Sequence, residues 1–293
     1  MSREASDQAQ GLRRVVSPEP VNVIAVSSGK GGVGKTNVSV NLAVSLAREG
    51  KEVVLLDADM GLANVDVLLG LSPEYDLSHV LSGERALDEV IVEGPGGLKI
   101  VPASSGIRQM ANLTEVEQAG LITAFNDLSH VIDVMVVDTG AGISSNVMNF
   151  CSAAQEVLVV VCDEPASITD AYAFIKVLSR EYGIKNYQVV ANMAHTAHEG
   201  RELFMKLSKA TDKYLDVVLS FLGTVPFDTK LRKSVQHQRA VVDAYPRSPS
   251  SLAFKRIANQ IKKTGRDGRT QGHLEFFVER LIKSENISTG AML

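Results

Sequence analysis

The octapeptide GKGGVGKT at residues 29–36 constrains the fold of this chain more than any other stretch. It matches the pattern G-x-x-x-x-G-K-[ST], with the apolar segment VNVIAVS before it and a helical pattern after it. In such a strand–loop–helix unit, glycines let the backbone wrap around a phosphate, and the helix N-terminus adds a partial positive charge. The sequence therefore predicts a phosphate-binding loop at the carboxyl end of a buried strand.

Further apolar segments predict the rest of the sheet. They are almost continuously apolar and do not alternate, which is typical of parallel strands that helices cover on both faces. Helical patterns such as NVSVNLAVSLAREG lie between them. We therefore expect an α/β fold with a doubly wound, mostly parallel sheet and helices on both faces. The expected strands are residues 21–27, 52–59, 98–103, 134–140, 156–163, 187–193 and 217–225.

Length and composition suit one large α/β domain with a short extension at each end. The chain has 293 residues, of which 45% are hydrophobic, and a formal net charge of −4. We expect residues 1–20 to form a flexible tail, residues 21–270 the main domain, and residues 271–293 an amphipathic helix with a frayed end. The tail lacks the apolar core of a signal peptide, and no apolar run reaches the roughly 18 residues of a membrane span, so we expect a cytoplasmic protein.

Three aspartates at predicted strand ends are candidate magnesium ligands, because Mg²⁺ at a phosphate site is usually bound by one or two nearby carboxylates. Asp57 and Asp59 end the segment LLDAD, and Asp138 begins DTGAG. In an open parallel sheet, ligands bind at the carboxyl ends of the strands. The Thr36 hydroxyl is the expected direct metal ligand, and Lys35 is expected to reach the β- and γ-phosphates. For each of these aspartates the alternative is a helix cap that follows a strand.

A second lysine in the loop, Lys30, has no role in the general phosphate-binding pattern. The stretch KGGVGKT resembles the deviant Walker A motif of the MinD/ParA (SIMIBI) family of P-loop ATPases, and the resemblance covers roughly residues 20–265. In that family the extra lysine reaches across a homodimer to the nucleotide of the other subunit. The resemblance therefore implies that Lys30 acts in trans, like an arginine finger, and that ATP drives dimerisation. The alternative is a solvated surface lysine.

Two further stretches resemble the switch regions of MinD-type proteins. DADMGLANVDVLLGL, at residues 57–71, is similar to switch I, and DTGAG, at residues 138–142, is similar to switch II. This resemblance implies that Asp59 positions the attacking water and that Asp138 binds Mg²⁺ through water. The implied cofactors are ATP and Mg²⁺. The expected catalytic residues are Lys30, Lys35 and Asp59, and the expected metal ligands are Thr36, Asp57, Asp59 and Asp138.

The base is expected to be adenine, because the guanine-reading N-K-x-D pattern is absent. Family members read adenine with an asparagine after a late strand and with a V-P-x-D segment, and Asn192 and VPFD resemble these. For Asn192 the alternative is an asparagine that forms a turn. The expected nucleotide contacts are Gly29, Lys30, Gly31, Gly32, Val33, Gly34, Lys35, Thr36, Asn37, Asn192, Pro226, Phe227 and Asp228.

The N-terminal tail and two internal stretches are similar to the FlhG/FleN subfamily of flagellar-number regulators. The tail contains DQAQGLR, which matches D-Q-A-x-x-L-R, and LLDADMGLANVDVLLGL and VVCDEPASITDAYAFIK also resemble that subfamily. The resemblance implies a slow ATPase switch that acts on FlhF, a signal-recognition-particle-type GTPase, and on a σ54-dependent flagellar transcription activator. The implied FlhF-binding residues are Asp7, Gln8, Ala9, Leu12 and Arg13.

Other functions in the same class remain open. A DNA-partitioning ParA-like ATPase would need a basic face, and residues 230–239 and 255–269 supply some positive charge, although the net acidic chain makes direct DNA binding unfavourable. Another MinD-like positioning ATPase is a further alternative. An electron carrier would need cysteines that share a cluster at the dimer axis, whereas Cys151 and Cys162 fall in a predicted helix and a predicted strand.

The segment HLEFFVERLIK, at residues 273–283, predicts an amphipathic helix. In MinD-like proteins a C-terminal helix binds membrane when ATP drives dimerisation, which implies a peripheral location on the inner face of the cell membrane at the pole. The acidic residues of this segment disfavour a membrane surface, and the alternative is a helix docked on the core. Membrane binding and docking on the core are compatible if the helix docks in the monomer and is released when ATP brings two subunits together. The apolar stripe consists of Leu274, Phe277, Val278, Leu281 and Ile282.

Overall fold

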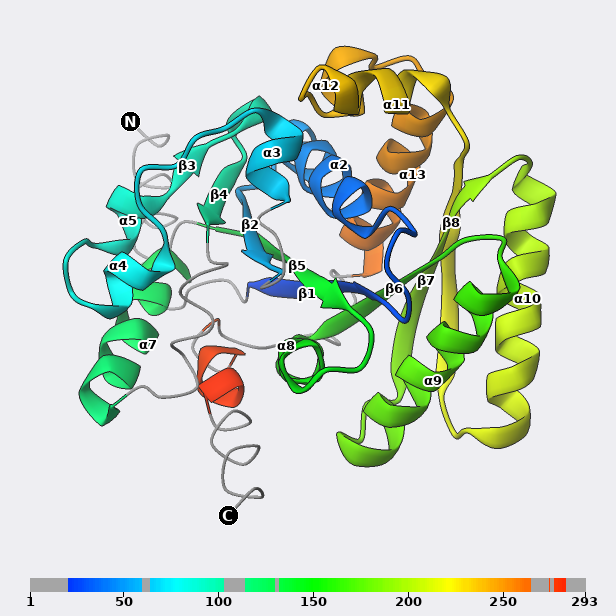
Figure 1. Ribbon diagram of the computed structural model, residues 1–293, viewed down its shortest axis with the longest axis horizontal. Coiled ribbons are helices and arrows are strands. Elements are labelled where there is room, and N and C mark those ends of the chain that lie inside the picture. The colour runs from blue at the N-terminus through cyan, green and yellow to red at the C-terminus, as the bar shows by residue number, and fades with distance from the viewer. Residues whose placement is uncertain are drawn as a thin grey trace, which may run out of the picture.

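The fold is a single eight-stranded sheet between two layers of helices (Figure 1). The computed structural model describes residues 21–59, 64–102, 114–129, 132–264, 274 and 277–282. The strand order is β3-β4-β2-β5-β1-β6-β7-β8, and only β3 runs antiparallel to its neighbour among the described strands. The strands are β1 (Asn22–Ser28), β2 (Val53–Ala58), β3 (Val92–Glu93), β4 (Lys99–Pro102), β5 (Val134–Ala141), β6 (Glu156–Val161), β7 (Asn186–Ala194) and β8 (Val218–Pro226).

The helices divide between the two faces of the sheet. Helices α2, α3, α12 and α13 contribute to the apolar core on one face, and α4, α5, α7, α8, α9 and α10 to the core on the other. They are α2 (Lys35–Arg48), α3 (Val65–Leu69), α4 (Leu77–Leu81), α5 (Leu87–Val90), α7 (Glu115–Ser129), α8 (Ser145–Ala153), α9 (Pro165–Glu181), α10 (Ala197–Tyr214), α11 (Thr229–Gln236), α12 (Val241–Ala244) and α13 (Pro249–Thr264), with a 3₁₀ turn, η1 (Pro95–Gly97).

The prediction of a doubly wound, mostly parallel sheet is confirmed. Every central strand is buried on both faces, which explains why its sequence is continuously apolar. The seven expected strands all form, with ends that shift by one or two residues, and Cys162 lies just after β6 and not inside it. The two-residue strand β3 was not predicted, because so short a segment carries no periodicity.

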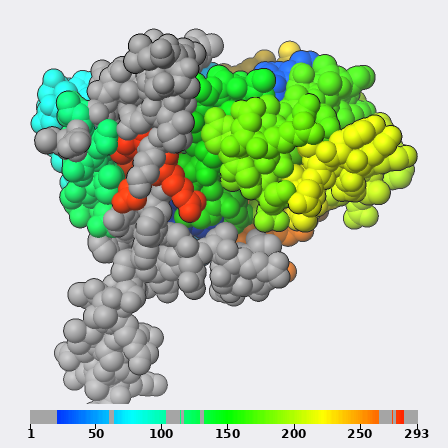
Figure 2. Space-filling view, turned by 90° about the horizontal axis from the view of Figure 1, so that it is seen from below, coloured from blue at the N-terminus to red at the C-terminus, as the bar shows by residue number. Residues whose placement is uncertain are grey.

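The C-terminal apolar stripe is docked on the core. Leu274, Phe277, Val278, Leu281 and Ile282 are all at most 4% exposed and belong to the apolar core on the face covered by α7, α8 and α9. The ring of Phe277 lies 6.4 Å from that of Phe150 in α8, and Figure 2 shows the segment in red beside the green elements of this face. Of the two alternatives, the structure shows the docked helix.

Other predictions concern segments that the structure does not describe. The tail, with Asp7, Gln8, Ala9, Leu12 and Arg13, lies outside the described residues, as does the expected domain boundary at residue 270. Among the described helices, none is both long and apolar enough to cross a bilayer.

Candidate functional site: a nucleotide pocket at the P-loop

The P-loop runs from the end of β1 into the first turn of α2 and lines a pocket of about 430 Å³. Two of its glycines are required by close approach. A Cβ on Gly29 would lie 2.1 Å from the backbone of Asp170, and Gly34 has φ +82° with Asn192 directly behind it. No other residue type fits either position without strain. The loop is thus pressed against α9 and β7, which leaves its other side open to a ligand.

Lys35 and Asp138 form a buried ion pair below this loop. The Lys35 Nζ lies 3.3 Å from Asp138 Oδ1 and 3.8 Å from Asp59 Oδ2. Burial raises the pKa of Asp138, while Lys35, Ser39 and Thr36 oppose the rise. The other carboxylate oxygen, Oδ2, is buried and has no hydrogen-bond partner among the described residues. Such an oxygen suits a metal-bound water, so the residues present fit a magnesium site.

Ser39 is a site residue that the sequence reasoning missed. It lies one helical turn after Lys35 in α2, and its hydroxyl donates a 2.7 Å hydrogen bond to Asp138 Oδ1. The i, i+4 spacing from Lys35 was the available signal, because both side chains then face the same strand. Ser39 therefore helps to orient the carboxylate that Lys35 neutralises.

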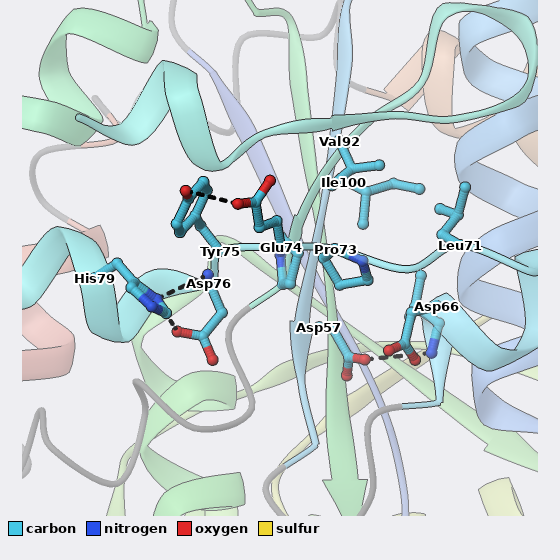
Figure 3. Close-up of a pocket in the computed structure, with 12 residues that line it drawn as sticks. Asp57, Asp66, Leu71, Pro73, Glu74, Tyr75, Asp76, His79, Val92 and Ile100 are labelled. Carbon is cyan, nitrogen blue, oxygen red and sulfur yellow. Dashed lines mark hydrogen bonds and ion pairs between the residues drawn. The ribbon is translucent and has the colours of Figure 1, made fainter. Parts of the chain in front are cut away.

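Asp57 makes the contacts of a helix cap. It pairs in register with Asp138 across β2 and β5, and its Oδ2 accepts hydrogen bonds from the backbone N–H groups of Asn64 and Val65, both at 3.2 Å. Burial, and then the charge of Asp138, raise the pKa of Asp57 to about 7. Figure 3 shows its carboxylate at the base of a second pocket, of about 180 Å³, beside Asp66. A magnesium role for Asp57 stays a prediction.

Asp59 lines the P-loop pocket, and its expected role in positioning water stays a prediction. Its Oδ2 accepts a 3.3 Å hydrogen bond from the side-chain amide of Asn64 and faces Lys35. Asn64 also lines the pocket and was not predicted as a site residue. The structure therefore brings a carboxylate, an amide and an ammonium group together in the lining of this pocket.

Lys30 is at the surface and pairs with Glu164, which follows β6. The Lys30 Nζ lies 2.5 Å from Glu164 Oε2, and the hydrogen bond and charge of Glu164 raise the pKa of Lys30. Both side chains are substantially exposed, at 38% and 57%, and exposed pairs of this kind contribute little to stability. The ammonium group is therefore accessible to a second molecule, while its role in trans stays a prediction.

The predicted base-reading residues are held by contacts within the chain. The Asn192 amide donates a 2.8 Å hydrogen bond to the carbonyl of Val33 and so supports the P-loop from behind. Asp228 caps α11 through the N–H of Lys230 and accepts two hydrogen bonds from Ser250 at the start of α13. Burial alone would raise the pKa of Asp228, but these hydrogen bonds lower it. Adenine contacts remain predicted for this region.

The alternatives of DNA binding and electron transfer gain no support from the described residues. In the basic segment 230–239, Arg239 pairs with Asp243, and Lys230 lies over the ring of Tyr245. Cys151 and Cys162 are buried in the cores on opposite faces of the sheet, so they cannot share one cluster. Burial raises the pKa of the Cys151 thiol to about 12, which suits an inert structural residue.

Comparison with known proteins identifies the family of P-loop proteins to which this chain belongs. The model of the ParA family, described as NUBPL iron-transfer P-loop NTPase, matches residues 19–262, and the chain belongs to this family of P-loop NTPases. The chain is 57% identical to the antiactivator FleN of Pseudomonas aeruginosa over 93% of its own length and 97% of that protein. It is 34% identical to the flagellum site-determining protein YlxH of Helicobacter pylori, over 89% of each chain.

Solved structures agree with this assignment. The cell division protein MinD of Aquifex aeolicus superposes with a TM-score of 0.66 at 28% identity, over 83% of this chain and 96% of the MinD chain in a MinC:MinD complex. The predicted membership of the MinD/ParA family, with resemblance to FleN, is therefore confirmed.

Proposed function

We propose that this chain is an ATP-dependent dimerisation switch that hydrolyses ATP slowly and regulates the number and placement of flagella. The observation that supports it most directly is the buried Lys35–Asp138 pair at the P-loop, with Asp59 opposite. Identity of 57% to a protein named antiactivator FleN supports the flagellar part. The proposed partners are a second copy of this chain, the GTPase FlhF and a σ54-dependent flagellar activator.

In the proposed mechanism, the P-loop N–H groups and Lys35 bind the β- and γ-phosphates of ATP. Thr36 and the free oxygen of Asp138 would hold Mg²⁺, directly and through water, and the ion would neutralise charge on the phosphates. Asp59 orients a water that attacks the γ-phosphorus. The bond to the β,γ-bridging oxygen breaks, and ADP and phosphate leave. While this bond breaks, Lys30 from the second subunit stabilises the charge that develops, which couples hydrolysis to dimerisation.

The two lysines and Asp59 are expected to have separable effects. Lys30→Ala should bind ATP normally but neither dimerise nor hydrolyse it, because only the trans contact is lost. Asp59→Ala should bind ATP, form dimers and stay dimeric, because only the attacking water is lost. Size-exclusion chromatography with Mg-ATP, alongside phosphate release, separates these outcomes. Normal ATP-dependent dimers of Lys30→Ala would refute the trans role.

The tail is proposed to activate the GTPase partner. Deletion of residues 1–20 should leave ATP binding and dimerisation unchanged, since the first described strand begins at Asn22 and the P-loop follows it in the sequence. The deletion should abolish stimulation of GTP turnover by purified FlhF. Equal turnover with the full-length and shortened chains would show that residues 1–20 do not carry this activity.

The proposed location follows from the same family relationship. We infer a cytoplasmic protein that contacts the inner face of the cell membrane at the pole when ATP is bound. This contact requires release of the C-terminal stripe, which is docked on the core in the structure. ParA-like partitioning of DNA, or positioning of another structure, is the alternative function for the same switch.

A further inference from the structure

Gln238, in the loop between α11 and α12, has no role in the proposed mechanism, yet it contacts the switch I helix α3. Its side-chain Nε2 donates a 3.0 Å hydrogen bond to the carbonyl of Val67, 171 residues away in the sequence. Its Cβ also lies against Gly70, where α3 ends. Gln238 lines the P-loop pocket together with Lys35 and Asp59. One side chain thus joins a distant loop, the switch helix and the nucleotide pocket.

Helix α3 depends on outside partners for its position. It has only five residues, and so short a helix is not stable by itself. At its start, Asp57 caps the N–H groups of Asn64 and Val65. At its end, Gly70 donates to the Val67 carbonyl at a long 3.4 Å, so Gln238 supplies the nearer donor for that carbonyl.

The backbone of Gln238 is held in an unfavourable conformation. Its φ is +52°, in the left-handed region that glycine adopts freely and that other residues, apart from asparagine and aspartate, rarely adopt. Among the described non-glycine residues, only Gln238 and Met193 have positive φ, and Met193 follows Asn192, which supports the P-loop. Of the two, only Gln238 is among the described residues that line the P-loop pocket. Strain of this kind persists only where the surrounding structure enforces it, and it is most frequent at functional sites.

We propose that Gln238 is a positioning residue that fixes α3 beside the P-loop pocket. Asn64, which precedes α3, donates to Asp59 Oδ2, so a shift of α3 moves this donor away from the carboxylate. The catalytic consequence rests on the proposed ATPase function, in which Asp59 orients water. The hydrogen bond that ties Gln238 to α3, here called the tether, does not depend on that function. Loss of Gln238 should therefore slow hydrolysis more than it weakens ATP binding, which depends on Lys35 and the loop glycines.

Two substitutions in the full-length chain remove the donor in different ways. Gln238→Glu keeps the size and the strained backbone but has no N–H to donate, whereas Gln238→Gly also relieves the strain. In both, hydrogen exchange of the amides at residues 64–71 should become roughly fivefold faster, as expected for loss of one hydrogen bond. Exchange in α10 should not change, and the unfolding midpoint of Gln238→Gly should stay the same or rise. Gln236→Glu is the control, because it adds the same charge at an exposed position two residues away. It should change neither the exchange at residues 64–71 nor the unfolding midpoint.

Steady-state ATP turnover provides the second readout. In both Gln238 variants kcat should fall about three- to tenfold while KM changes less than about twofold. Unchanged exchange at residues 64–71 in both variants would overturn the tether. Faster exchange with unchanged kcat would overturn the positioning of Asp59. If the wild-type protein itself does not hydrolyse ATP, the proposed function fails, and the exchange result alone decides whether Gln238 fixes α3.

Discussion

Lys35→Met is expected to weaken ATP binding by at least about 100-fold, because the proposed mechanism gives its ammonium group charge-assisted contacts with two phosphates. It should also destabilise the nucleotide-free protein by about 3 kcal/mol, because it removes the charged partner of the fully buried Asp138. Titration with a fluorescent ATP analogue measures the first effect, and urea unfolding measures the second.

A double substitution separates the two effects of Lys35. In Lys35→Met with Asp138→Asn, no unpaired charge remains between these two positions, so stability should return to within about 1 kcal/mol of the wild type. ATP binding should remain lost. If Lys35→Met binds ATP within about threefold of the wild type, the P-loop assignment is wrong. If the double variant is no more stable than Lys35→Met, the pair does not carry the destabilisation.

Phe277→Glu is expected to have the largest effect on stability. The Phe277 side chain is 1% exposed and packs against Phe150. Replacing it with a carboxylate removes apolar contacts and buries a charge, which should lower the free energy of unfolding by about 4 kcal/mol or more. Arg280→Glu is the matched control, because it introduces the same residue at an exposed position of the same helix and should cost less than about 0.5 kcal/mol. Urea unfolding of both variants provides the measurement, and equal stability would contradict the docked helix.

The same helix also decides the membrane proposal. If ATP releases the stripe, hydrogen exchange at residues 277–282 should become faster with Mg-ATP, and the wild-type dimer should sediment with anionic liposomes only when ATP is present. Two helices in one dimer bind a surface together far better than one. Unchanged protection with ATP, with the dimer left in the supernatant, would make the helix a permanent part of the fold.

Features that depend on neighbouring residues were predictable from the sequence. The P-loop is one strand, one turn and one helix start, so its glycines and Lys35 appear together in eight residues. The strands were recognisable because burial on both faces leaves a continuous apolar segment wherever the strand lies in the sheet. The apolar stripe of the C-terminal helix was also visible, since its members recur at helical spacing.

The partners of these features came only from the tertiary structure. Asp57 lies at the end of β2 and Asp59 directly after it, but the N–H groups at the start of α3 reach Asp57, whereas Asp59 faces Lys35. The sequence of an apolar stripe does not indicate whether the stripe contacts lipid or protein. In this structure it packs against the apolar core beside α8.

The sequence by itself thus determined which groups this protein has for binding phosphate, and tertiary structure decided what each group contacts. The contact between Gln238 and Val67 is the clearest case. It joins residues 171 positions apart, and it needs a left-handed backbone that nothing around Gln238 in the sequence indicates. Local spacing encodes helices, strands and turns, whereas a hydrogen bond between distant loops exists only once the sheet has brought their ends together.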